Sequence, residues 1–390
     1  MEILDRYISQ LLENSTPECP AWFKEKREEG CGLKWNYIDG CMIKAVLELY
    51  HMNQDTGYLE FADGFIDRFV NEDGSIVSYR PEDYNLDNVN AGKTLFDLYH
   101  LTGKAKYRKG IDLIYSQLQT QPRTKGGNFW HKQIYPNQIW LDGLYMAMPF
   151  YAKCLAESGE DGWDDVLDQF ESAHRLLWNE ESRLYLHGCD VSRRAAWADP
   201  VTGCSPAVWL RSEGWFLMAL TDVYELAKDH TPRAAKLAEL LKNAVDGIMQ
   251  YQDETAHMFF QVVDQAGYPG NYLETSGSAM AAYAMMKGAR LNMLPDPYGE
   301  QGSRVLDGIR DTYLRKEADG WHLYGICASA GLGEGPDPHN RKDRSGKTEY
   351  YVSEPQMTDN QHGTGACMMA VSEQLLRGRQ DGKGDGACCN

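Results

Sequence analysis

One pattern recurs six times along the chain: a polar loop with an acidic residue, a glycine, and then a helix-forming segment that is apolar almost all round. The clearest copy runs over 128–154, where Asp142 and Gly143 precede the segment LYMAMPFYA. A helix that is apolar on every side must be buried on every side. The chain therefore needs an architecture that buries six such helices at once.

The glycines of this pattern are far enough apart for each copy to hold two helices. More amphipathic segments, with charge on one face as surface helices have, lie between the copies. The first residues, MEILDRYISQLLENS, are amphipathic in the same way. Apolar helices that alternate with half-polar ones are typical of an all-α (α/α)6 barrel, whose parallel inner helices would bring six acidic residues to one rim. The glycines are at 40, 92, 143, 214, 277 and 363, and the amphipathic segments at 58–69, 105–118, 164–177, 233–251 and 304–316.

Shorter signals predict additions to the barrel. Segments 176–190 and 248–264 each end a helix, turn through acidic residues and continue as a short aromatic strand, which predicts β-hairpin insertions on the rim. The loop 331–353 is long and rich in Gly, Pro and charge, as lids, site walls or disordered segments are. We expect residues 1–377 to form a single barrel domain and the Gly-rich residues 378–390 a disordered tail.

Charge and composition narrow the class of protein. A net charge of −18 argues against a nucleic-acid surface and against electrostatic binding to anionic membranes. No apolar run approaches the length of a membrane span, and the N-terminus lacks the features of a signal peptide. Ten scattered cysteines without C-x-x-C spacing fit reduced thiols. We predict a cytoplasmic protein, of an oligomeric state that the sequence leaves open.

The rim would gather acids, cations and aromatic rings in one concave surface. Taken singly, each acid can be explained as a helix cap, Arg211 as half of a salt bridge, and His131 and His187 as structural histidines. Together they suit a carbohydrate enzyme, because rings stack on sugar faces and paired acids transfer protons. The acids are Asp39, Asp87, Asp142, Glu213, Glu274 and Asp359; the cations are His131, Lys132, His187 and Arg211; the aromatics are Trp35, Tyr37, Trp130, Trp140, Trp209 and Trp215.

Other chemistries find little support in the motifs. The sequence has no G-x-G-x-x-G after a strand, no Walker loop, no H-E-x-x-H, no calcium loop and no G-x-S-x-G. We therefore expect no cofactor and no metal. Neighbouring carboxylates and Trp would raise the pKa of one acid, whereas a helix N-terminus would lower it, and the sequence leaves open which effect dominates at Asp142.

Four long motifs resemble the unsaturated rhamnogalacturonyl hydrolases of glycoside hydrolase family 105, relatives of the family 88 unsaturated glucuronyl hydrolases. They are DNVNAGKTLFDLYHLTGKAKY, NQIWLDGLYMAMPFYAKC, VWLRSEGWFLMALTDVYE and GNYLETSGSAMAAYAMMKGA, and the likeness extends from about Trp35 to Leu375. The resemblance implies an (α/α)6 barrel acting on oligosaccharides left by polysaccharide lyases, whose terminal uronic acid carries a C4=C5 double bond.

The resemblance also implies a mechanism. An acid protonates C4, positive charge develops at C5 and the ring oxygen, water adds at C5, and the resulting hemiketal opens and expels the rest of the substrate. The matching motifs put the general acid/base on Asp142 and a partner, which tunes Asp142 or holds the sugar, on Asp87. The residues expected to meet the substrate through its carboxylate, hydroxyls or ring faces are His131, Lys132, His187, Arg211, Trp209, Trp215, Trp35 and Trp140.

Part of the chain departs from the family pattern. Relatives usually show a shorter R-D-G-S-x-x-Y-Y run where this chain reads RKDRSGKTEYY, and K-G-x-G in place of Gln361, His362 and Gly363. The sugar next to the unsaturated uronate is therefore open: rhamnose is expected first, with other lyase products as the alternative. A sugar-binding barrel without catalysis and an unrelated (α/α)6 epimerase or inverting glucosidase are further alternatives.

Overall fold

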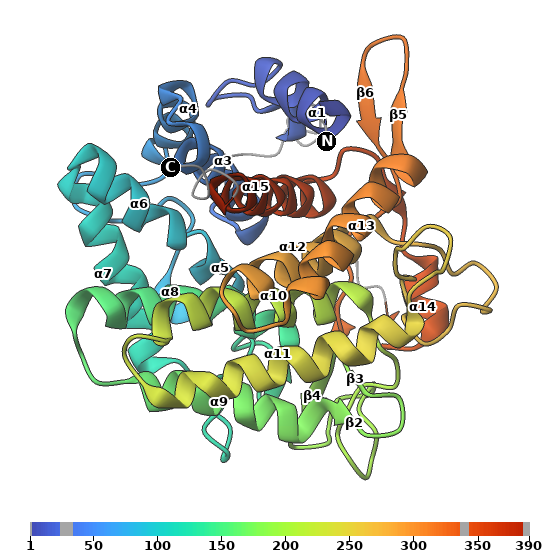
Figure 1. The fold of residues 1–390 in the computed structure, drawn as a ribbon. Coiled ribbons are helices and arrows are strands. Elements are labelled where there is room, and N and C mark those ends of the chain that lie inside the picture. Colours follow the sequence, from blue (N-terminus) through green and yellow to red (C-terminus); the bar gives the residue numbers. More distant parts are fainter. Residues whose placement is uncertain (1, 24–33, 336–342, 385–390) are drawn as a thin grey trace.

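The computed structural model describes residues 2–23, 34–335 and 343–384, and these form a closed ring of inner helices surrounded by outer ones (Figure 1). Each inner helix packs against the next, and the last one returns to the first, which confirms the (α/α)6 barrel. In ring order the inner helices are α3 (Tyr37–Asn53), α5 (Asp87–Asn90) with α6 (Lys93–Thr102), α8 (Leu141–Ser158), α10 (Leu210–Ala227), α12 (Thr275–Arg290) and α15 (Gln361–Gly384).

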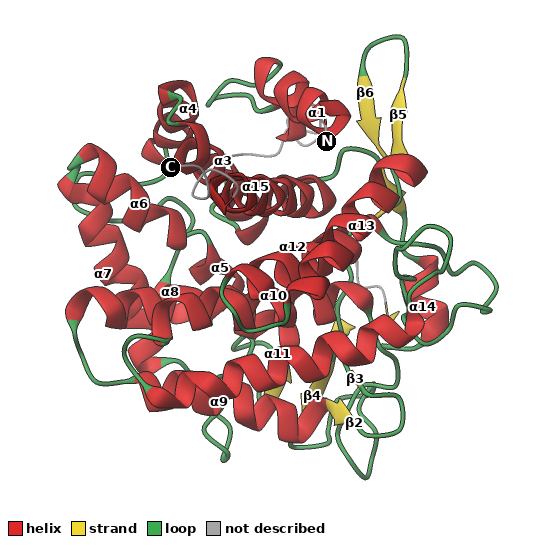
Figure 2. Ribbon diagram, viewed as in Figure 1, coloured by secondary structure: helices red, strands yellow, loops and turns green. Residues whose placement is uncertain are grey.

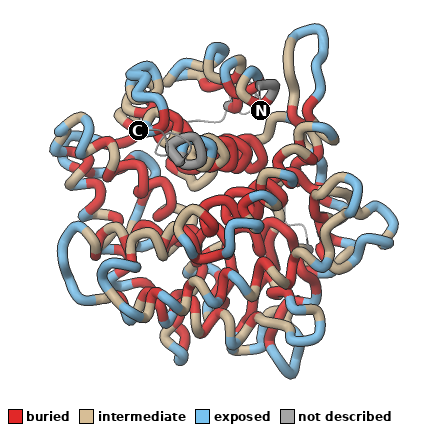
Figure 3. Tube along the Cα trace, in the orientation of Figure 1, coloured by how far each residue is buried: buried red, intermediate tan, exposed pale blue. Residues whose placement is uncertain are grey.

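The outer helices pack mainly on the inner helix that precedes them, and the first helix of the chain closes the outer ring against α15. Helices dominate the described chain (Figure 2), and buried residues gather in the inner helices while exposed ones lie on the outer turns and loops (Figure 3). The outer helices are α1 (Glu2–Glu13), α4 (Thr56–Asp67), α7 (Ala105–Thr120), α9 (Trp163–Leu177), α11 (Ala235–Ile248) and α13 (Asp296–Tyr313).

Small residues let the inner helices approach one another closely. A Cβ added to Gly40 of α3 would lie 2.6 Å from the Cα of Ala91, and one added to Gly214 of α10 would lie 2.8 Å from the Cβ of Met280. The second inner helix is broken at Ala91 and Gly92, so that Asp87 begins the short α5 instead of one continuous helix. Gly40 and Gly214 of the repeated pattern thus mark points of close contact between inner helices.

Within the described residues, the strands form five two-stranded pairs on the barrel. The hairpin predicted at 176–190 is confirmed by β2 (Trp178–Asn179) with β3 (Leu184–Tyr185). The hairpin predicted at 248–264 is wrong: after the 3-10 helix Met249–Tyr251, Asp253 accepts the N–H groups of Thr255 and Ala256 in a tight turn, and the chain then makes only isolated bridges. The other pairs are β1 (Gln138–Trp140) with β4 (Gly188–Asp190), β5 (Leu314–Lys316) with β6 (Trp321–Leu323), β7 (Ile326–Cys327) with β10 (Gln356–Met357), and β8 (Gly333–Glu334) with β9 (Asp343–Arg344).

Short helices complete the connections: Ala21–Phe23, Pro81–Asp83 and Pro232–Ala234 are 3-10 helices, and α14 (Thr348–Ser353) follows β9.

The boundary expected at residue 378 lies inside α15, which continues to Gly384, and residues 385–390 of the predicted tail lie outside the described residues. Of the long loop, 336–342 also lie outside them. Every described helix is too short or too polar to cross a membrane.

Candidate active site

A cavity of about 480 Å³ opens where several inner helices begin, and both Asp87 and Asp142 line it. Its walls come from the first turns of α3, α5 and α8, from the loop around residue 132, and from two late segments of the chain. The sequence-based expectation that these two aspartates share one hollow is met. The other lining residues are Lys34, Asn36, Tyr37, Ile38, Asn85, Asn88, His131, Lys132, Ile134, Trp140, Met146, Ser329, Ala330 and Arg344.

Local pairing of two strands brings His187 beside Asp142. Trp140 at the end of β1 is opposite Gly188 of β4, and the Leu141 N–H donates to the carbonyl of His187 at 3.0 Å. Asp142 follows in the first turn of α8, and its Oδ2 lies 3.0 Å from His187 Nε2. The other ring nitrogen of His187, Nδ1, lies 2.6 Å from the hydroxyl of Tyr351. The carboxylate is therefore held against a fully buried and oriented imidazole.

The electrostatics of Asp142 resolve a question that the sequence left open. Burial acts to raise the pKa of Asp142, but the adjacent His187 and, further away, His131 outweigh it. The net result is that the pKa of Asp142 is lowered from its ordinary value. In the free site Asp142 is therefore ionised at neutral pH.

Asp87 lies between two neighbours from the loop before β1. Lys132 Nζ is 2.5 Å from Asp87 Oδ2, and His131 Nε2 is 3.4 Å from Asp87 Oδ1. A bridge between Asn85 and Lys132 holds this loop against the start of α5. Burial lowers the pKa of His131 to about 4, although Asp87 opposes the shift, so its imidazole is neutral near pH 7. The charge of Asp87 is balanced by Lys132.

Trp140 lines the cavity, but two rings of the protein already stack on it. The ring centroids of His131 and Tyr135 lie 4.5 Å and 5.0 Å from that of Trp140, with interplanar angles of 18° and 19°. His187 also meets it edge-on at 5.3 Å. The indole thus orders the histidines around Asp87 and Asp142, and much of its surface is unavailable for a sugar.

Besides His187, which is fully buried beside Asp142 and does not line the cavity, four residues expected to contact substrate lie behind the cavity walls. Trp35, Trp209 and Trp215 are almost completely buried, and none of them is among the residues that line the cavity. Trp35 donates to the carbonyl of Asn88 at 2.8 Å, and Trp215 stacks on Tyr145 at 4.8 Å. The fourth residue is Arg211. Sequence motifs located these side chains near the site, but they could not distinguish residues that line the cavity from residues that lie behind its wall.

Arg211 supports the late wall of the cavity. Its Nη1 donates to the carbonyl of Cys327 at 2.7 Å and to Ser276 Oγ at 3.2 Å, while Nη2 donates to the carbonyl of Ala328. The guanidinium also lies 4.7 Å from the ring centroid of Trp209. Because Ser329 follows directly and lines the cavity, Arg211 holds this backbone in place from behind.

The four remaining acids of the expected rim serve the fold. Asp39 accepts from Gln361 Nε2 at 2.6 Å, and Glu274 caps α12 through the N–H groups of Ser276 and Gly277. Glu213 is fully buried and accepts the N–H of Tyr185. Asp359 accepts the N–H of Leu323 and the hydroxyl of Tyr7. For these acids the explanation as structural or capping residues holds.

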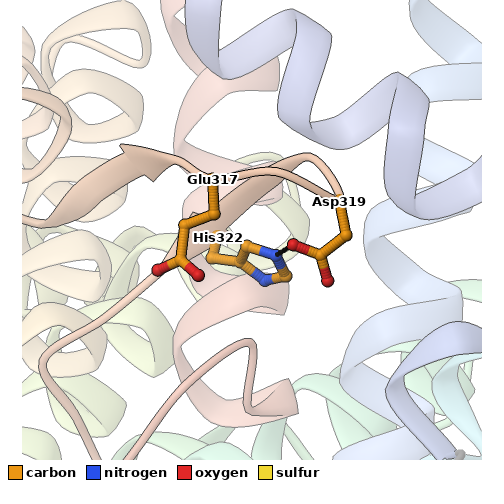
Figure 4. Close-up of side chains that lie close together, drawn as sticks. All are labelled: Glu317, Asp319 and His322. Carbon is orange, nitrogen blue, oxygen red and sulfur yellow. Dashed lines mark hydrogen bonds and ion pairs between the residues drawn. The ribbon is translucent and has the colours of Figure 1, made fainter.

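Outside the cavity, Glu317, Asp319 and His322 lie close together on the β5–β6 hairpin (Figure 4). His322 Nε2 is 3.1 Å from Asp319 Oδ1, and its Nδ1 is 2.7 Å from Asp359 Oδ2. Burial lowers the pKa of His322, but the two aspartates outweigh this effect and raise it. A histidine held between two carboxylates explains the cluster as a polar network that fixes the hairpin to the start of α15.

Several lining residues were not expected from the sequence. Asn88 is within a recognised motif, and Tyr37 was assigned to the rim only as an aromatic residue, so both carried some signal. No sequence pattern indicated that Lys34 or Ile134 would line the cavity. Arg344 lies in the loop that departs from the family pattern, and its position depends on how β9 pairs with β8.

Several known proteins resemble this chain in sequence and fold. A family model described as Glycosyl Hydrolase Family 88 matches residues 16–377. The solved structure of a family 105 glycoside hydrolase from C. acetobutylicum superposes with a TM-score of 0.84 and 39% identity, covering 88% of this chain and 94% of that one. "Protein Atu3128" of Agrobacterium fabrum is 38% identical over 240 residues, 60% of this chain and 100% of its own length. "Unsaturated rhamnogalacturonyl hydrolase YesR" of Bacillus subtilis is 25% identical over 328 residues, 80% of this chain and 89% of its own.

Proposed function

The chain belongs to Glycosyl Hydrolase Family 88, and on that basis we propose that it releases the 4,5-unsaturated uronic acid from rhamnogalacturonan oligosaccharides produced by a lyase. The observation that carries the proposal is that Asp87 and Asp142 line one cavity together with Lys132 and His131. The name of the Bacillus subtilis relative supports rhamnogalacturonyl substrates among those of the family.

In the proposed reaction Asp142 gives a proton to C4 of the unsaturated ring and then accepts one from the water that adds at C5. The hemiketal formed at C5 opens, and the remaining sugar leaves with its own oxygen. His187, 3.0 Å from Asp142, and Asp87, paired with Lys132, flank the proton donor. Asp87 would hold a hydroxyl of the ring or the attacking water, because a carboxylate bound to one cation keeps further acceptor positions.

The lowered pKa of Asp142 has to be reconciled with its role as an acid. The uronate carries its own carboxylate into the cavity, and a like charge nearby favours protonation of Asp142. Substrate binding would therefore raise the pKa of the acid at the moment when its proton is required. Asp142 would return to the ionised form after the product leaves.

The test is hydrolysis of lyase-treated rhamnogalacturonan, followed through the absorbance of the C4=C5 bond. Asp142→Asn should reduce the rate by about 10²–10⁴-fold, the usual contribution of a general acid, while the melting temperature stays close to that of the parent protein. In D₂O the product should carry deuterium at C4. A variant at the full rate, or a product without deuterium at C4, would refute the mechanism.

The choice of substrate is tested separately. A panel of unsaturated disaccharides that differ only in the second sugar should show the highest kcat/KM when that sugar is rhamnose. If a glucuronyl product of another polysaccharide were preferred, the chain would be an unsaturated glucuronyl hydrolase with a different preference. Tight binding of all of these sugars without turnover would instead favour a sugar-binding barrel.

A further inference from the structure

One arginine in the wall of the cavity makes its hydrogen bonds through one side of its guanidinium group. Arg344, at the end of β9, is half-buried and held by several acceptors on one side of its guanidinium. Its Nε donates to the carbonyl of Gly333 at 2.9 Å, and its Nη2 donates to the hydroxyl of Tyr135 at 2.8 Å. Backbone oxygens of Leu332 and Glu334 also accept from Nη2, at 3.3 Å and 3.1 Å. These contacts fix the plane of the group.

The third nitrogen of the Arg344 guanidinium, Nη1, takes no part in these hydrogen bonds. Nη1 has no hydrogen-bond acceptor among the described residues, and none of their carboxylates lies within ion-pair distance of the guanidinium. It rests against Gly331, where an added Cβ would lie 2.5 Å from Nη1 and 3.4 Å from Cζ3 of Trp140. Since arginine is always charged in proteins, a fixed and uncompensated cation faces the cavity beside Trp140.

The other cations near the cavity are less suited to an anion. Lys132 is paired with Asp87 at 2.5 Å, and His131 is neutral because burial lowers its pKa to about 4. Lys34 is exposed and sits on a flexible four-carbon stem. Arg211 donates to backbone carbonyls behind the wall. Arg344 alone combines a rigid position, a free nitrogen and no acidic partner in the described part of the chain.

Resting on the proposed function, we propose that Arg344 binds the carboxylate of the unsaturated uronyl residue through Nη1 and so sets the specificity of the enzyme for the free acid. A planar guanidinium is the side chain best matched to a carboxylate. Tyr135, which fixes Arg344, also stacks on Trp140, two residues before Asp142. The carboxylate and the proton donor are thus positioned by one aromatic stack, which would orient C4 toward Asp142.

The experiment compares two substrates that differ only at this carboxyl group: an unsaturated uronyl disaccharide as the free acid and as its methyl ester. The parent enzyme should show a kcat/KM on the order of 10- to 100-fold higher for the acid, the size of a hydrogen bond to a charged group. Arg344→Gln should lose this advantage through a lower kcat/KM for the acid, while the ester is hydrolysed at nearly the parental rate. A purely structural role would instead lower both rates together.

Two further variants make the comparison sharper. Gly331→Ala keeps every charge but places a methyl group 2.5 Å from Nη1, so it should displace the guanidinium and reduce the preference for the acid. Lys34→Gln removes another cation of the cavity and should leave most of the preference intact. Thermal unfolding of each variant checks that the barrel is preserved.

Each outcome separates this inference from the proposed function. If the parent enzyme hydrolyses neither compound, the proposed function fails. If it hydrolyses the acid, but Arg344→Gln keeps the full preference for the acid over the ester, Arg344 does not bind the carboxylate and the inference is overturned. A loss of preference in Lys34→Gln alone would transfer the role to Lys34.

Discussion

Two acids in the same kind of position show how strongly the surroundings of a residue decide its chemistry. Asp142 and Glu213 each lie in the first turn of an apolar inner helix. Asp142 faces His187 and has a lowered pKa. Among the described residues, the Glu213 carboxyl group has only the N–H of Tyr185 as partner and its Oε2 is buried without one, and burial raises its pKa to about 8. One acid is therefore ionised at neutral pH and the other is largely protonated.

Glu213 should make the stability of the barrel depend on pH. Its folded-state pKa of about 8 exceeds the ordinary value of 4.5, so its protonated form is fully favourable below pH 4.5 and that stability is lost as pH rises toward 8. The loss is roughly 1.4 kcal/mol per pH unit within this window. Glu213→Gln retains an acceptor for Tyr185 and cannot ionise. We expect it to match the parent protein near pH 5 and to be more stable by about 3 kcal/mol at pH 8.

Urea unfolding at several pH values between 5 and 8 measures this difference. The free energy of unfolding should fall less steeply with pH in Glu213→Gln than in the parent protein. The two slopes should differ by up to about 1.4 kcal/mol per pH unit, which corresponds to one bound proton. Equal slopes for the two proteins would show that Glu213 is already ionised in the folded state.

Single residues were predictable where a local motif carries them. Asp142, Asp87, His131 and Lys132 lie within short motifs, and the structure brings all four to one cavity. A substrate-binding role is expected for Arg211 because it matches the arginine of the family's W-x-R-x-x-G-W run, yet its donors face backbone carbonyls. The position of a side chain in front of or behind a wall depends on contacts between distant segments, which no local pattern encodes.

At the scale of the elements, helix contacts depend on the absence of a single side chain. Gly40 of α3 meets the backbone of Ala91, between α5 and α6, where a Cβ would lie 2.6 Å from Cα and 2.7 Å from Cβ of Ala91. Both atoms belong to or adjoin the backbone, so they cannot rotate away. The two inner helices would have to move apart to accept a methyl group.

Gly40→Ala should therefore destabilise the protein by about 1–3 kcal/mol, the usual cost of overpacking a core. The intrinsic preference of Ala over Gly in helices acts in the opposite direction and is smaller. Gly378 in α15 is the matched control, because an added Cβ there meets nothing within 4 Å. Gly378→Ala should leave stability unchanged or raise it by up to about 1 kcal/mol. Denaturant midpoints of both variants measure the difference, and equal midpoints would contradict the close contact.

Helices were predictable from the sequence because their period and glycine pattern repeat six times. The strands were less so. The hairpin at 176–190 forms, but at 248–264 the aromatic segment pairs with more distant partners, as in the bridges Phe260 to Leu273 and Trp209 to Val262. Strand pairing is a contact between segments, so a pattern within one segment indicates a strand without identifying its partner.

At the scale of the whole molecule, the barrel is closed by the two ends of the chain. α1 packs against α15, and the hydroxyl of Tyr7 donates to Asp359 Oδ1 at 2.9 Å and lies 3.1 Å from Thr364 Oγ1. Asp359 also accepts the N–H of Leu323. The first helix, the β5–β6 hairpin and the last helix thus meet at one carboxylate.

If α1 is an integral part of the ring, a small defect at Tyr7 should weaken the whole barrel. Tyr7→Phe removes the hydroxyl from a buried site and should lower the free energy of global unfolding by about 1–2 kcal/mol. Tyr50→Phe is the control, since the Tyr50 hydroxyl makes no side-chain hydrogen bond to a described residue. Amide hydrogen exchange distinguishes the alternatives: an integral α1 would show faster exchange in the inner helices of Tyr7→Phe, through global opening. If exchange accelerated only within α1 while the inner helices kept their protection, α1 would be an independent arm, and the five other outer helices would suffice to hold the ring.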